Sequence, residues 1–424
     1  MERMESLTPK TNRAVIADNN DDGFQFAKRV SQITVSAIKQ MPILARQVGG
    51  CVSLGQGIPS FNTPDFIREA IITELRDNDA LGKYSMQPGL PELKQAIGED
   101  LTRTKNIANI DAESQIFISC GGMEALATAI SCIVERDDEV ILPSPTYASH
   151  IEQILFAEGQ PRFVPVLEQE GWRLDVDAIA KAITKKTKAI ILCNPVNPTG
   201  AVFPESDLRA VAELVLANDL YLIMDEAYDF LLYDDTPYFS PMSISELADN
   251  LICACSFSKR YCMTGWRVGF MYAPPAVIRQ ALKVHDAFAI CAPTISQYAA
   301  LAALRATNGK DGPGDQFVNQ LVAALARRRD LVCRRLDDLA DMFTYTTPKG
   351  GYYVFPKFAS EESSVDFAIR LLNEAKVITV PGSAFGPTGE AHLRLSFGAT
   401  DEELHEAFDR IVKFRSVNPV PARR

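Results

Sequence analysis

The chain of 424 residues has no tract rich in lysine or arginine and no apolar run that approaches the ~18 residues needed to cross a bilayer. Its acidic residues outnumber its basic residues by 54 to 43, and the formal net charge is −11. Binding to phosphodiester backbones usually requires a basic patch, so we expect no nucleic acid among the partners. The longest apolar runs, such as A-I-I-L-C from Ala189, have only strand length, so we expect no membrane span.

Cysteine and histidine are sparse where a metal site or a disulfide framework would need them. The nine cysteines lie mostly inside apolar segments and form no C-x-x-C pair, which indicates reduced core residues of a cytoplasmic protein. Cys253 and Cys255 alternate on an expected strand and have the spacing to bind a metal in principle. None of the four histidines is close to them in the sequence, so we favour core packing and expect no metal.

Residues 1–23 are polar and contain the acidic patch D-N-N-D-D-G. They lack the basic-then-apolar order of a secretory signal and the arginine bias of a transit peptide, so we expect a flexible N-terminal arm. The chain as a whole, with 47% hydrophobic residues, is long enough for a large core that divides into two domains.

From about residue 115 onward, short β-rich runs alternate with runs in which apolar residues recur every three or four positions. This alternation predicts an α/β fold with a mainly parallel central sheet flanked by helices. We expect strands at 115–119, 138–143, 162–166, 188–193, 220–225 and 251–256, and helices at 123–134, 175–183 and 205–217. A glycine-rich break at 308–315 leads into a smaller α+β domain. We therefore assign 62–305 to a large domain, and 24–61 with 306–424 to a small domain.

Polar residues follow two of the expected strands, at the edge where parallel sheets bind ligands. Asp225 ends the strand 220–225, where a carboxylate can be a metal ligand, a general base, the partner of a protonated nitrogen or a solvated loop acid. Lys259 follows the strand 251–256 in the run S-F-S-K-R-Y-C-M-T-G-W-R-V-G-F. Apolar surroundings weaken the charged form of an amine and make it a better nucleophile toward aldehydes, which indicates Schiff-base chemistry.

Two parts of the sequence carry groups that suit a phosphate. Ser256 and Ser258 are two positions apart, so in an extended segment their hydroxyls would point to the same side, and Arg267 adds a fork-shaped cation. Gly121 and Gly122 lie where the strand 115–119 turns into a helix, so backbone N–H groups and the positive helix end can face an anion there. Neither G-x-x-x-x-G-K nor G-x-G-x-x-G occurs, so the sequence gives no support to nucleotide binding of those kinds.

Four motifs in their order along the chain resemble one family. They are N-P-x-N-P-T-G from Asn194, D-E-A-Y from Asp225, S-F-S-K-x-Y-x-M-T-G-W-R-x-G-F from Ser256 and L-R-L-S-F from Leu393. The chain resembles the class I/II aminotransferases of the aspartate aminotransferase superfamily, which have fold type I and use pyridoxal 5′-phosphate (PLP). The resemblance extends from about Ser53 to the C-terminus, and the combination of four motifs is highly specific.

The resemblance implies a role for each matched residue at the reactive end of PLP. Lys259 would form the covalent link to the cofactor aldehyde and then move a proton between substrate and cofactor. Asp225 would keep the pyridine nitrogen protonated, so that the ring can accept electrons. Asn197 and Tyr228 would bond the phenolic oxygen of the ring, and Tyr147 would stack on the ring.

The resemblance also implies residues for the phosphate and for the substrate. The phosphate would be held by Arg267, by the hydroxyls of Ser256 and Ser258, by the backbone of Gly121, Gly122 and Met123, and by Tyr84 from the other subunit of a homodimer with shared active sites. Arg394, in the middle of an expected strand, would bind the substrate α-carboxylate with two parallel hydrogen bonds, together with Gly57 and Asn197. A structural salt bridge is the alternative for this arginine.

Two departures from the family pattern bear on the substrate. Ile58 and Ser60 replace two acids of the pattern L-x-x-G-E-P-D-F, and Met123 stands where some relatives that act on acidic substrates have lysine. We therefore expect an apolar or aromatic amino acid as one substrate and a 2-oxo acid as the other. The amino group would pass between them in a ping-pong cycle through PLP and its pyridoxamine form.

Two further functions compete with the aminotransferase. One is another PLP reaction on the same fold, namely an elimination lyase, a ring-forming synthase or an oxidase, because all of these share the lysine, the acid and the arginine. The other is a regulator that uses an aminotransferase-like domain as a sensor. A regulator needs a DNA-binding module, and the roughly 50 residues before Gln56 leave little room for one.

Overall fold

The computed structural model describes residues 26–33 and 37–418. The expected arm, residues 1–23, lies outside the described residues. Within the described part of the chain, no helix is both long enough and apolar enough to cross a membrane.

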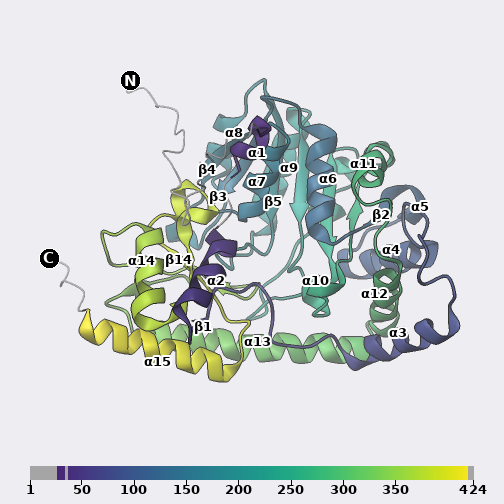
Figure 1. The fold of residues 1–424 in the computed structure, drawn as a ribbon. Coiled ribbons are helices and arrows are strands. Elements are labelled where there is room, and N and C mark those ends of the chain that lie inside the picture. The colour runs from purple at the N-terminus through teal and green to yellow at the C-terminus, as the bar shows by residue number, and fades with distance from the viewer. Residues whose placement is uncertain (1–25, 34–36, 419–424) are drawn as a thin grey trace.

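A seven-stranded sheet in the order β2-β8-β7-β6-β5-β3-β4 forms the centre of the larger part of the molecule (Figure 1). All neighbouring strands are parallel except where β8 pairs with β2 and β7. The strands are β2 (Ile116–Ser119), β3 (Glu139–Ser144), β4 (Gln160–Pro165), β5 (Thr187–Cys193), β6 (Tyr221–Asp225), β7 (Leu251–Ser256) and β8 (Gly269–Tyr272). The predicted mainly parallel α/β sheet is confirmed. The prediction missed β8, which has only four residues and begins at the end of the lysine run.

Helices cover both faces of this sheet, because side chains along each strand alternate between two apolar cores. In β6, Leu222 and Met224 belong to one core and Ile223 to the other. The first core is closed by α3 (Asp65–Asp77), α4 (Pro91–Lys105), α8 (Val176–Ala182), α9 (Glu205–Ala217) and α12 (Thr294–Ala306). The second is closed by α6 (Gly122–Ile133), α7 (Ala148–Phe156) and α11 (Pro275–Phe288). Cys253 and Cys255 both lie in the first core, and all nine cysteines are free thiols.

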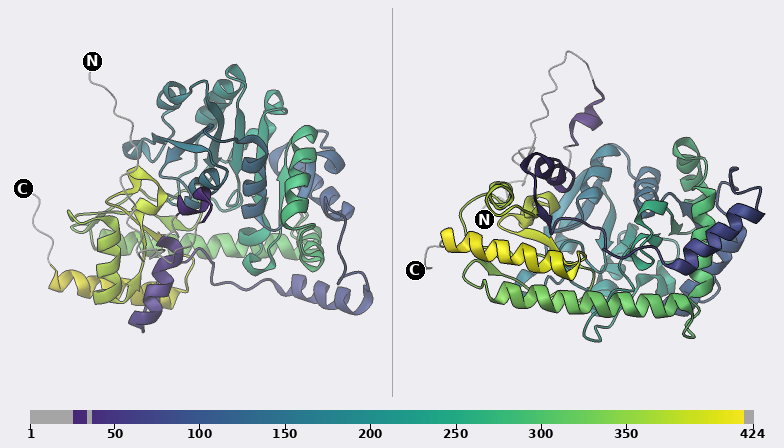
Figure 2. Two further views of the ribbon diagram at one scale, coloured as in Figure 1. Left: turned by 45° about the horizontal axis from the view of Figure 1, so that its top comes forward. Right: turned by 60° about the horizontal axis from the view of Figure 1, so that its bottom comes forward.

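A third apolar core lies in the part of the molecule built from both ends of the described chain (Figure 2). Its three-stranded sheet consists of β10 (Tyr353–Val354), β14 (Leu393–Ser396) and β13 (Val380–Pro381). Two short pairs accompany it: β1 (Val52–Ser53) with β12 (Val377–Ile378), and β9 (Phe343–Thr344) with β11 (Lys357–Phe358). The helices are α2 (Ala37–Val48), α13 (Pro313–Asp337), α14 (Ser364–Arg370) and α15 (Asp401–Val417). In Figure 1, α13 runs along the bottom of the molecule and joins the two parts.

The parallel register brings the predicted site residues to one edge of the large sheet. Cys193, the last residue of β5, pairs with Asp225 at the end of β6, and Asp225 pairs with Ala254 near the end of β7. The turn after β5, the segment after β6 and the helix that carries Lys259 therefore begin side by side. The fold positions a candidate site at the carboxyl ends of these strands.

Candidate active site

Asp225 ends β6 as a buried carboxylate with a histidine beside it. Its Oδ2 lies 3.2 Å from Nε2 of His150, and its Oδ1 accepts from the backbone N–H of Ala227 at 3.3 Å. His150 is fully buried on α7, and its Nδ1 lies 3.2 Å from Oγ1 of Thr146. This chain of contacts fixes the orientation of the Asp225 carboxylate. Sequence reasoning missed His150, although it lies one helical turn after Tyr147, which was predicted.

Lys259 lies in a short helix, α10 (Phe257–Arg260), directly after β7. Its Nζ donates to the carbonyl oxygen of Gly57 at 2.5 Å. Burial lowers the pKa of the Lys259 amine below its ordinary value, and the nearby cations Arg394 and Arg267 act in the same direction. A lysine with a lowered pKa exposes more of the neutral, nucleophilic amine near neutral pH. This environment suits covalent chemistry at an aldehyde.

The two serines before Lys259 differ from the sequence prediction. An extended segment was expected from Ser256 to Ser258, but β7 ends at Ser256 and α10 begins at Phe257. The prediction was wrong because Ser256 is an N-cap residue, whose Oγ accepts from the backbone N–H of Ser258 at 3.1 Å. The alternation of side chains on a strand therefore does not apply across these positions.

The turn between β2 and α6 lies against the guanidinium of Arg267. Gly121 has φ +86°, and a Cβ placed on it would lie 2.6 Å from Nη2 of Arg267. Arg267 itself is tied to this turn, because its Nη2 donates to the carbonyl oxygen of Cys120 at 3.3 Å and its Nη1 to that of Thr264 at 2.8 Å. Gly122 begins α6, where the first N–H groups have no partner inside the helix. Backbone N–H groups and a fixed cation thus meet at one place, as an anion requires.

Arg394 on β14 is 1% exposed and forms no ion pair among residues 26–33 and 37–418. Its Nη1 donates to Oδ1 of Asn197 at 3.1 Å and its Nη2 to the carbonyl oxygen of Gly55 at 2.8 Å. Its Nε is buried without a hydrogen-bond partner. The structural salt bridge considered from the sequence is therefore not found there. A buried guanidinium that lacks an anion and keeps a free donor is prepared to receive one.

Three tyrosines close the site from the side of the smaller sheet. The hydroxyl of Tyr228 lies 3.1 Å from that of Tyr353, and Tyr352 donates to the carbonyl oxygen of Gly57 at 2.6 Å. The ring of Tyr353 lies 4.4 Å from the Arg394 guanidinium carbon. Tyr352 and Tyr353 were seen in the sequence only as part of a strand, and no local pattern marked them as site residues.

Of the remaining predicted residues, Tyr147 and Met123 lie together, with the Tyr147 hydroxyl 3.7 Å from the Met123 sulfur. Tyr147 immediately precedes α7 and is half-buried. Tyr84 differs, because its side chain is 78% exposed and it makes no hydrogen bond or ring contact with the other predicted residues. Within one chain, the structure therefore brings together all predicted site residues except Tyr84.

The assembled residues fit PLP. The amine of Lys259 suits an aldehyde, the buried Asp225 suits a protonated ring nitrogen, and the Gly121 turn with Arg267 suits a phosphate. Gly121 leaves the space beside the Arg267 guanidinium free of a Cβ, which a phosphate-binding turn needs. One chain therefore offers groups for the aldehyde, the ring nitrogen and the phosphate of this cofactor.

Comparison with known proteins agrees with this geometry. Residues 50–411 match the family model described as aminotransferase class I and II. The chain belongs to the class I and II aminotransferases. As a member of this family it is a PLP-dependent transferase, so the family, the fold class and the enzyme class predicted from the sequence are confirmed.

Three similar proteins illustrate the range of named activities. An aromatic-amino-acid aminotransferase 2 of Thermococcus litoralis is 36% identical over 386 residues, which cover 91% of this chain and 97% of that protein. An aspartate aminotransferase of Pyrococcus abyssi has the same identity and the same coverage. The crystal structure of an aromatic aminotransferase from Pyrococcus horikoshii OT3 superposes with a TM-score of 0.83 at 35% identity, covering 90% of this chain and 100% of that one.

Proposed function

We propose that this aminotransferase moves the amino group of an apolar or aromatic amino acid to a 2-oxo acid in a ping-pong reaction. The observation that carries the proposal is the state of Arg394, a buried guanidinium with a free Nε and no carboxylate partner in the described part of the chain. An α-carboxylate is common to every amino acid and 2-oxo acid, so both substrates can use this group in turn.

The proposed apolar preference rests on two side chains, Met123 beside Tyr147 and Ile58 directly after Gly57. Met123 is 37% exposed and contacts Tyr147 through its sulfur, and Ile58 is 55% exposed. Neither side chain offers a charge to a distal carboxylate. An apolar or aromatic substrate side chain would therefore lose less hydration energy here than an acidic one.

In this proposal each residue has one task. Bound PLP supplies an aldehyde and an electron-accepting ring. Lys259 would hold the cofactor through its aldehyde and would carry a proton to or from the substrate α-carbon. Asp225 would keep the ring nitrogen protonated, and Tyr228 with Asn197 would donate to the ring oxygen. Arg267, Ser256, Ser258 and the Gly121–Met123 turn hold the phosphate, while Arg394, Gly57 and Asn197 orient the substrate carboxylate.

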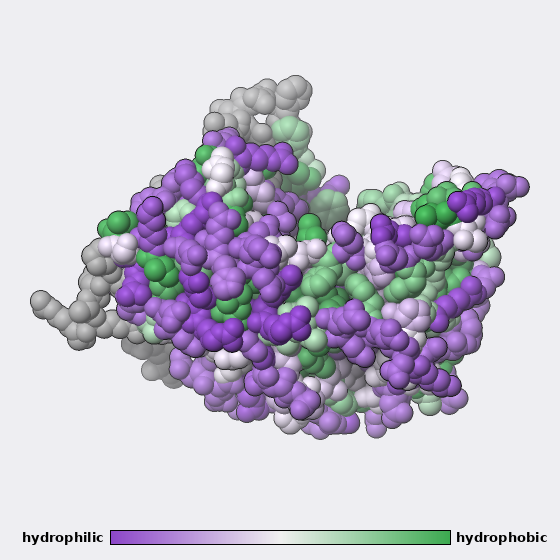
Figure 3. All heavy atoms as spheres, turned by 90° about the horizontal axis from the view of Figure 1, so that it is seen from below, coloured by the Kyte–Doolittle hydropathy of each residue, from purple (hydrophilic) through white to green (hydrophobic). Residues whose placement is uncertain are grey.

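We further propose a cytoplasmic homodimer in which Tyr84 completes the partner's site. Tyr84 and the nearby Met86 are both highly exposed, although each side chain is large and apolar. Seen from below, the molecule is hollowed between its two ends, and apolar residues line the hollow (Figure 3). Exposed apolar surface of this kind favours a protein partner. Nine free thiols support the reducing compartment.

The domain division proposed from the sequence, 62–305 against 24–61 with 306–424, has support from the cores. The first two cores draw mainly on the large segment, and the third core draws mainly on the two outer segments. The third core also includes Tyr228 and Tyr233, so the proposed domains would meet beside the site.

A half-reaction screen tests the function. The wild-type protein loaded with PLP is mixed with each of the twenty amino acids, without any 2-oxo acid, and the absorbance of the bound cofactor is followed. We expect apolar and aromatic amino acids to convert the visible band without releasing ammonia. Release of ammonia or peroxide would instead indicate a lyase or an oxidase. The variant Lys259→Ala should lack the visible band, and retention of that band would overturn the site.

A further inference from the structure

A buried lysine contacts the segment 225–229 at the end of β6. Lys105, the last residue of α4, is 8% exposed, and its Nζ lies 2.5 Å from Oδ2 of Asp229 and 3.3 Å from Oε2 of Glu226. The same ammonium lies 4.3 Å from the centre of the Tyr238 ring. Burial opposes the charge of Lys105, but Asp229 and Glu226 outweigh it and raise the pKa of the amine. Lys105 is therefore a charged residue within the fold.

The two carboxylates alternate with the two site residues of the same segment. Asp225 contacts His150, and Tyr228 contacts Tyr353, whereas Glu226 and Asp229 contact Lys105. The segment therefore has one side facing the candidate active site and the other facing Lys105. A backbone bond ties the beginning of the segment to the sheet, since Glu226 N–H donates to the carbonyl oxygen of Ala254 at 3.1 Å. Near its end, the carbonyl oxygen of Tyr228 accepts from the N–H of Leu231 in the following turn at 2.9 Å.

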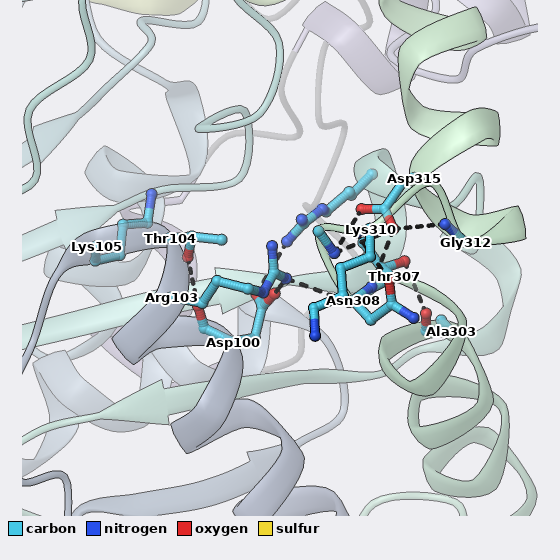
Figure 4. A network of polar contacts seen from close by, with 12 residues as sticks. Asp100, Arg103, Thr104, Lys105, Ala303, Thr307, Asn308, Lys310, Gly312 and Asp315 are labelled. Carbon is cyan, nitrogen blue, oxygen red and sulfur yellow. Dashed lines mark hydrogen bonds and ion pairs between the residues drawn. The ribbon is translucent and has the colours of Figure 1, made fainter.

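The end of α4 that carries Lys105 is anchored on its other side (Figure 4). Arg103 donates to the carbonyl oxygen of Thr307 at 3.3 Å, and Arg260 pairs with Asp100 at 3.0 Å. Figure 4 shows Lys105 directed away from these contacts. Asp315 accepts from the backbone N–H groups of Asn308, Gly309 and Gly312 and so closes the loop to which Arg103 is tied. Lys105 thus projects from a firmly held helix end.

The ion pairs of Lys105 are poorly suited to a role in stability alone. Glu226 is buried, and its Oε2 has no hydrogen-bond donor, because the contact with Lys105 lacks hydrogen-bond geometry. Buried charges that are incompletely hydrogen-bonded add little stability compared with apolar residues. The ion pairs do restrict the position of the segment, because two carboxylates of its five residues contact the single ammonium of Lys105.

We propose that Lys105 is a positioning residue, which holds the segment 225–229 from behind so that Asp225 and Tyr228 face the cofactor. This inference rests on the proposed function for the roles of Asp225 and Tyr228. The contact between Lys105 and the segment stands independently of that function. The inference can therefore be tested on the protein both with and without PLP.

The test compares Lys105→Met with Lys94→Met in the full chain. Methionine keeps the length of the side chain and removes the charge. Lys94 is a matched control, because it lies on the same helix, is also buried, and bonds to the carbonyl oxygen of Glu113 at 2.8 Å and to its carboxylate at 3.0 Å. Asp229→Asn is a milder second variant, which decides the question if Lys105→Met does not fold.

Two measurements are made on each variant. In the protein without PLP, amide hydrogen exchange of peptides covering 225–229 should be faster in Lys105→Met than in wild type. With PLP, Lys105→Met should bind the cofactor about tenfold more weakly, as expected for residues of one polar network, and the pH midpoint of the visible absorbance should rise. Asp229→Asn should change in the same direction by less, and Lys94→Met should match wild type in both measurements.

Unchanged exchange at 225–229 in Lys105→Met, or equal changes in Lys94→Met, would overturn the inference. If Lys105→Met does not fold, unchanged exchange in Asp229→Asn would overturn it equally. Failure of the wild-type protein to bind PLP would overturn the proposed function instead, and the exchange measurement would still decide the role of Lys105.

Discussion

Arg394 donates a hydrogen bond from Nη1 to Oδ1 of Asn197 over 3.1 Å, across the boundary between the small and large sheets. This bond assigns the Asn197 amide, because its oxygen is occupied and only its nitrogen is left to donate to a ligand. The residue proposed to bind the substrate carboxylate therefore orients a residue proposed to bind the cofactor. Substrate and cofactor binding should be linked through this pair.

Replacing Arg394 should separate substrate binding from cofactor binding. In Arg394→Met, the KM for the amino acid should rise about 100-fold, since hydrogen bonds to charged groups each contribute roughly 1.5–3 kcal/mol. The visible absorbance of bound PLP should remain, because Lys259 still forms the covalent link. Steady-state kinetics and absorbance measure the two effects.

Arg394→Lys and Arg329→Met are the comparisons for this variant. Lysine should not restore the KM, because it lacks the planar fork of a guanidinium. Arg329 is also a buried arginine but pairs with Asp234 at 2.6 Å, so Arg329→Met should reduce stability and leave the KM unchanged. Loss of the cofactor absorbance in Arg394→Met would assign this arginine to PLP instead.

Gly121 should be essential for holding the cofactor phosphate. In Gly121→Ala, the new Cβ would lie 2.6 Å from Nη2 of Arg267, and the backbone would be strained at φ +86°. Arg267 must move, so we expect PLP to bind at least about tenfold more weakly, as for the loss of one charge-assisted hydrogen bond. Titration of the PLP-free protein with PLP gives the dissociation constant.

Gly265→Ala is the matched control for this change. Gly265 is two residues from Arg267, and a Cβ placed on it meets no atom within 4 Å. This variant should bind PLP as the wild type does. Equal weakening in both variants would contradict the prediction, because the loss of PLP binding would then not depend on the contact between position 121 and Arg267.

Lys259 should destabilise the PLP-free protein at neutral pH. Its pKa in the folded state is lowered from 10.5, chiefly by burial, so the unfolded state binds more protons. Stability contributed at this position should therefore rise with pH between the lowered folded-state pKa and the unfolded value of 10.5. Below this window the charged amine is buried at a cost.

The variant Lys259→Met, which cannot titrate, reveals this cost. Its free energy of unfolding without PLP should exceed that of wild type at neutral pH, and the difference should shrink as the pH approaches 10.5. Urea unfolding of both proteins at several pH values gives the difference. A difference that is constant or grows with pH would contradict the lowered pKa.

The sequence predicts this site well where the chemistry is local and poorly where it depends on distant segments. Asp225 and Lys259 could be placed because parallel strands bring their carboxyl ends to one edge, whatever the details of packing. His150 and Tyr353 could not, because their roles arise from contacts with Asp225 and Tyr228 that are far away in the chain.

Local rules also failed where two of them compete. Strand alternation predicted one orientation for Ser256 and Ser258, but the capping bond of Ser256 ends the strand and begins a helix turn. In the same way, β8 was missed because a four-residue strand between two others needs little sequence signal when its partners are already in place. Tertiary pairing supplies what the local pattern lacks.

The exposure of Tyr84 leads to a test of the shared site. If Tyr84 serves the partner subunit, then each active site takes Lys259 from one chain and Tyr84 from the other. Tyr84→Ala and Lys259→Ala would therefore remove residues that different chains supply to one site. A mixed dimer of the two variants would contain one site with both defects and one site with neither. We therefore expect two weakly active or inactive proteins to regain activity when they are unfolded together and refolded as a mixture.

The recovered activity has an expected size. Random pairing makes half of the dimers mixed, and each mixed dimer has one intact site, so about a quarter of the wild-type activity should return. A mixture of Lys259→Ala with Arg394→Met is the control, because the structure places both residues in the site of one chain. Each site of that mixed dimer has one of the two defects and none is intact, so no activity should return. Absence of recovery with Tyr84→Ala, or equal recovery in the control, would contradict the proposed sharing.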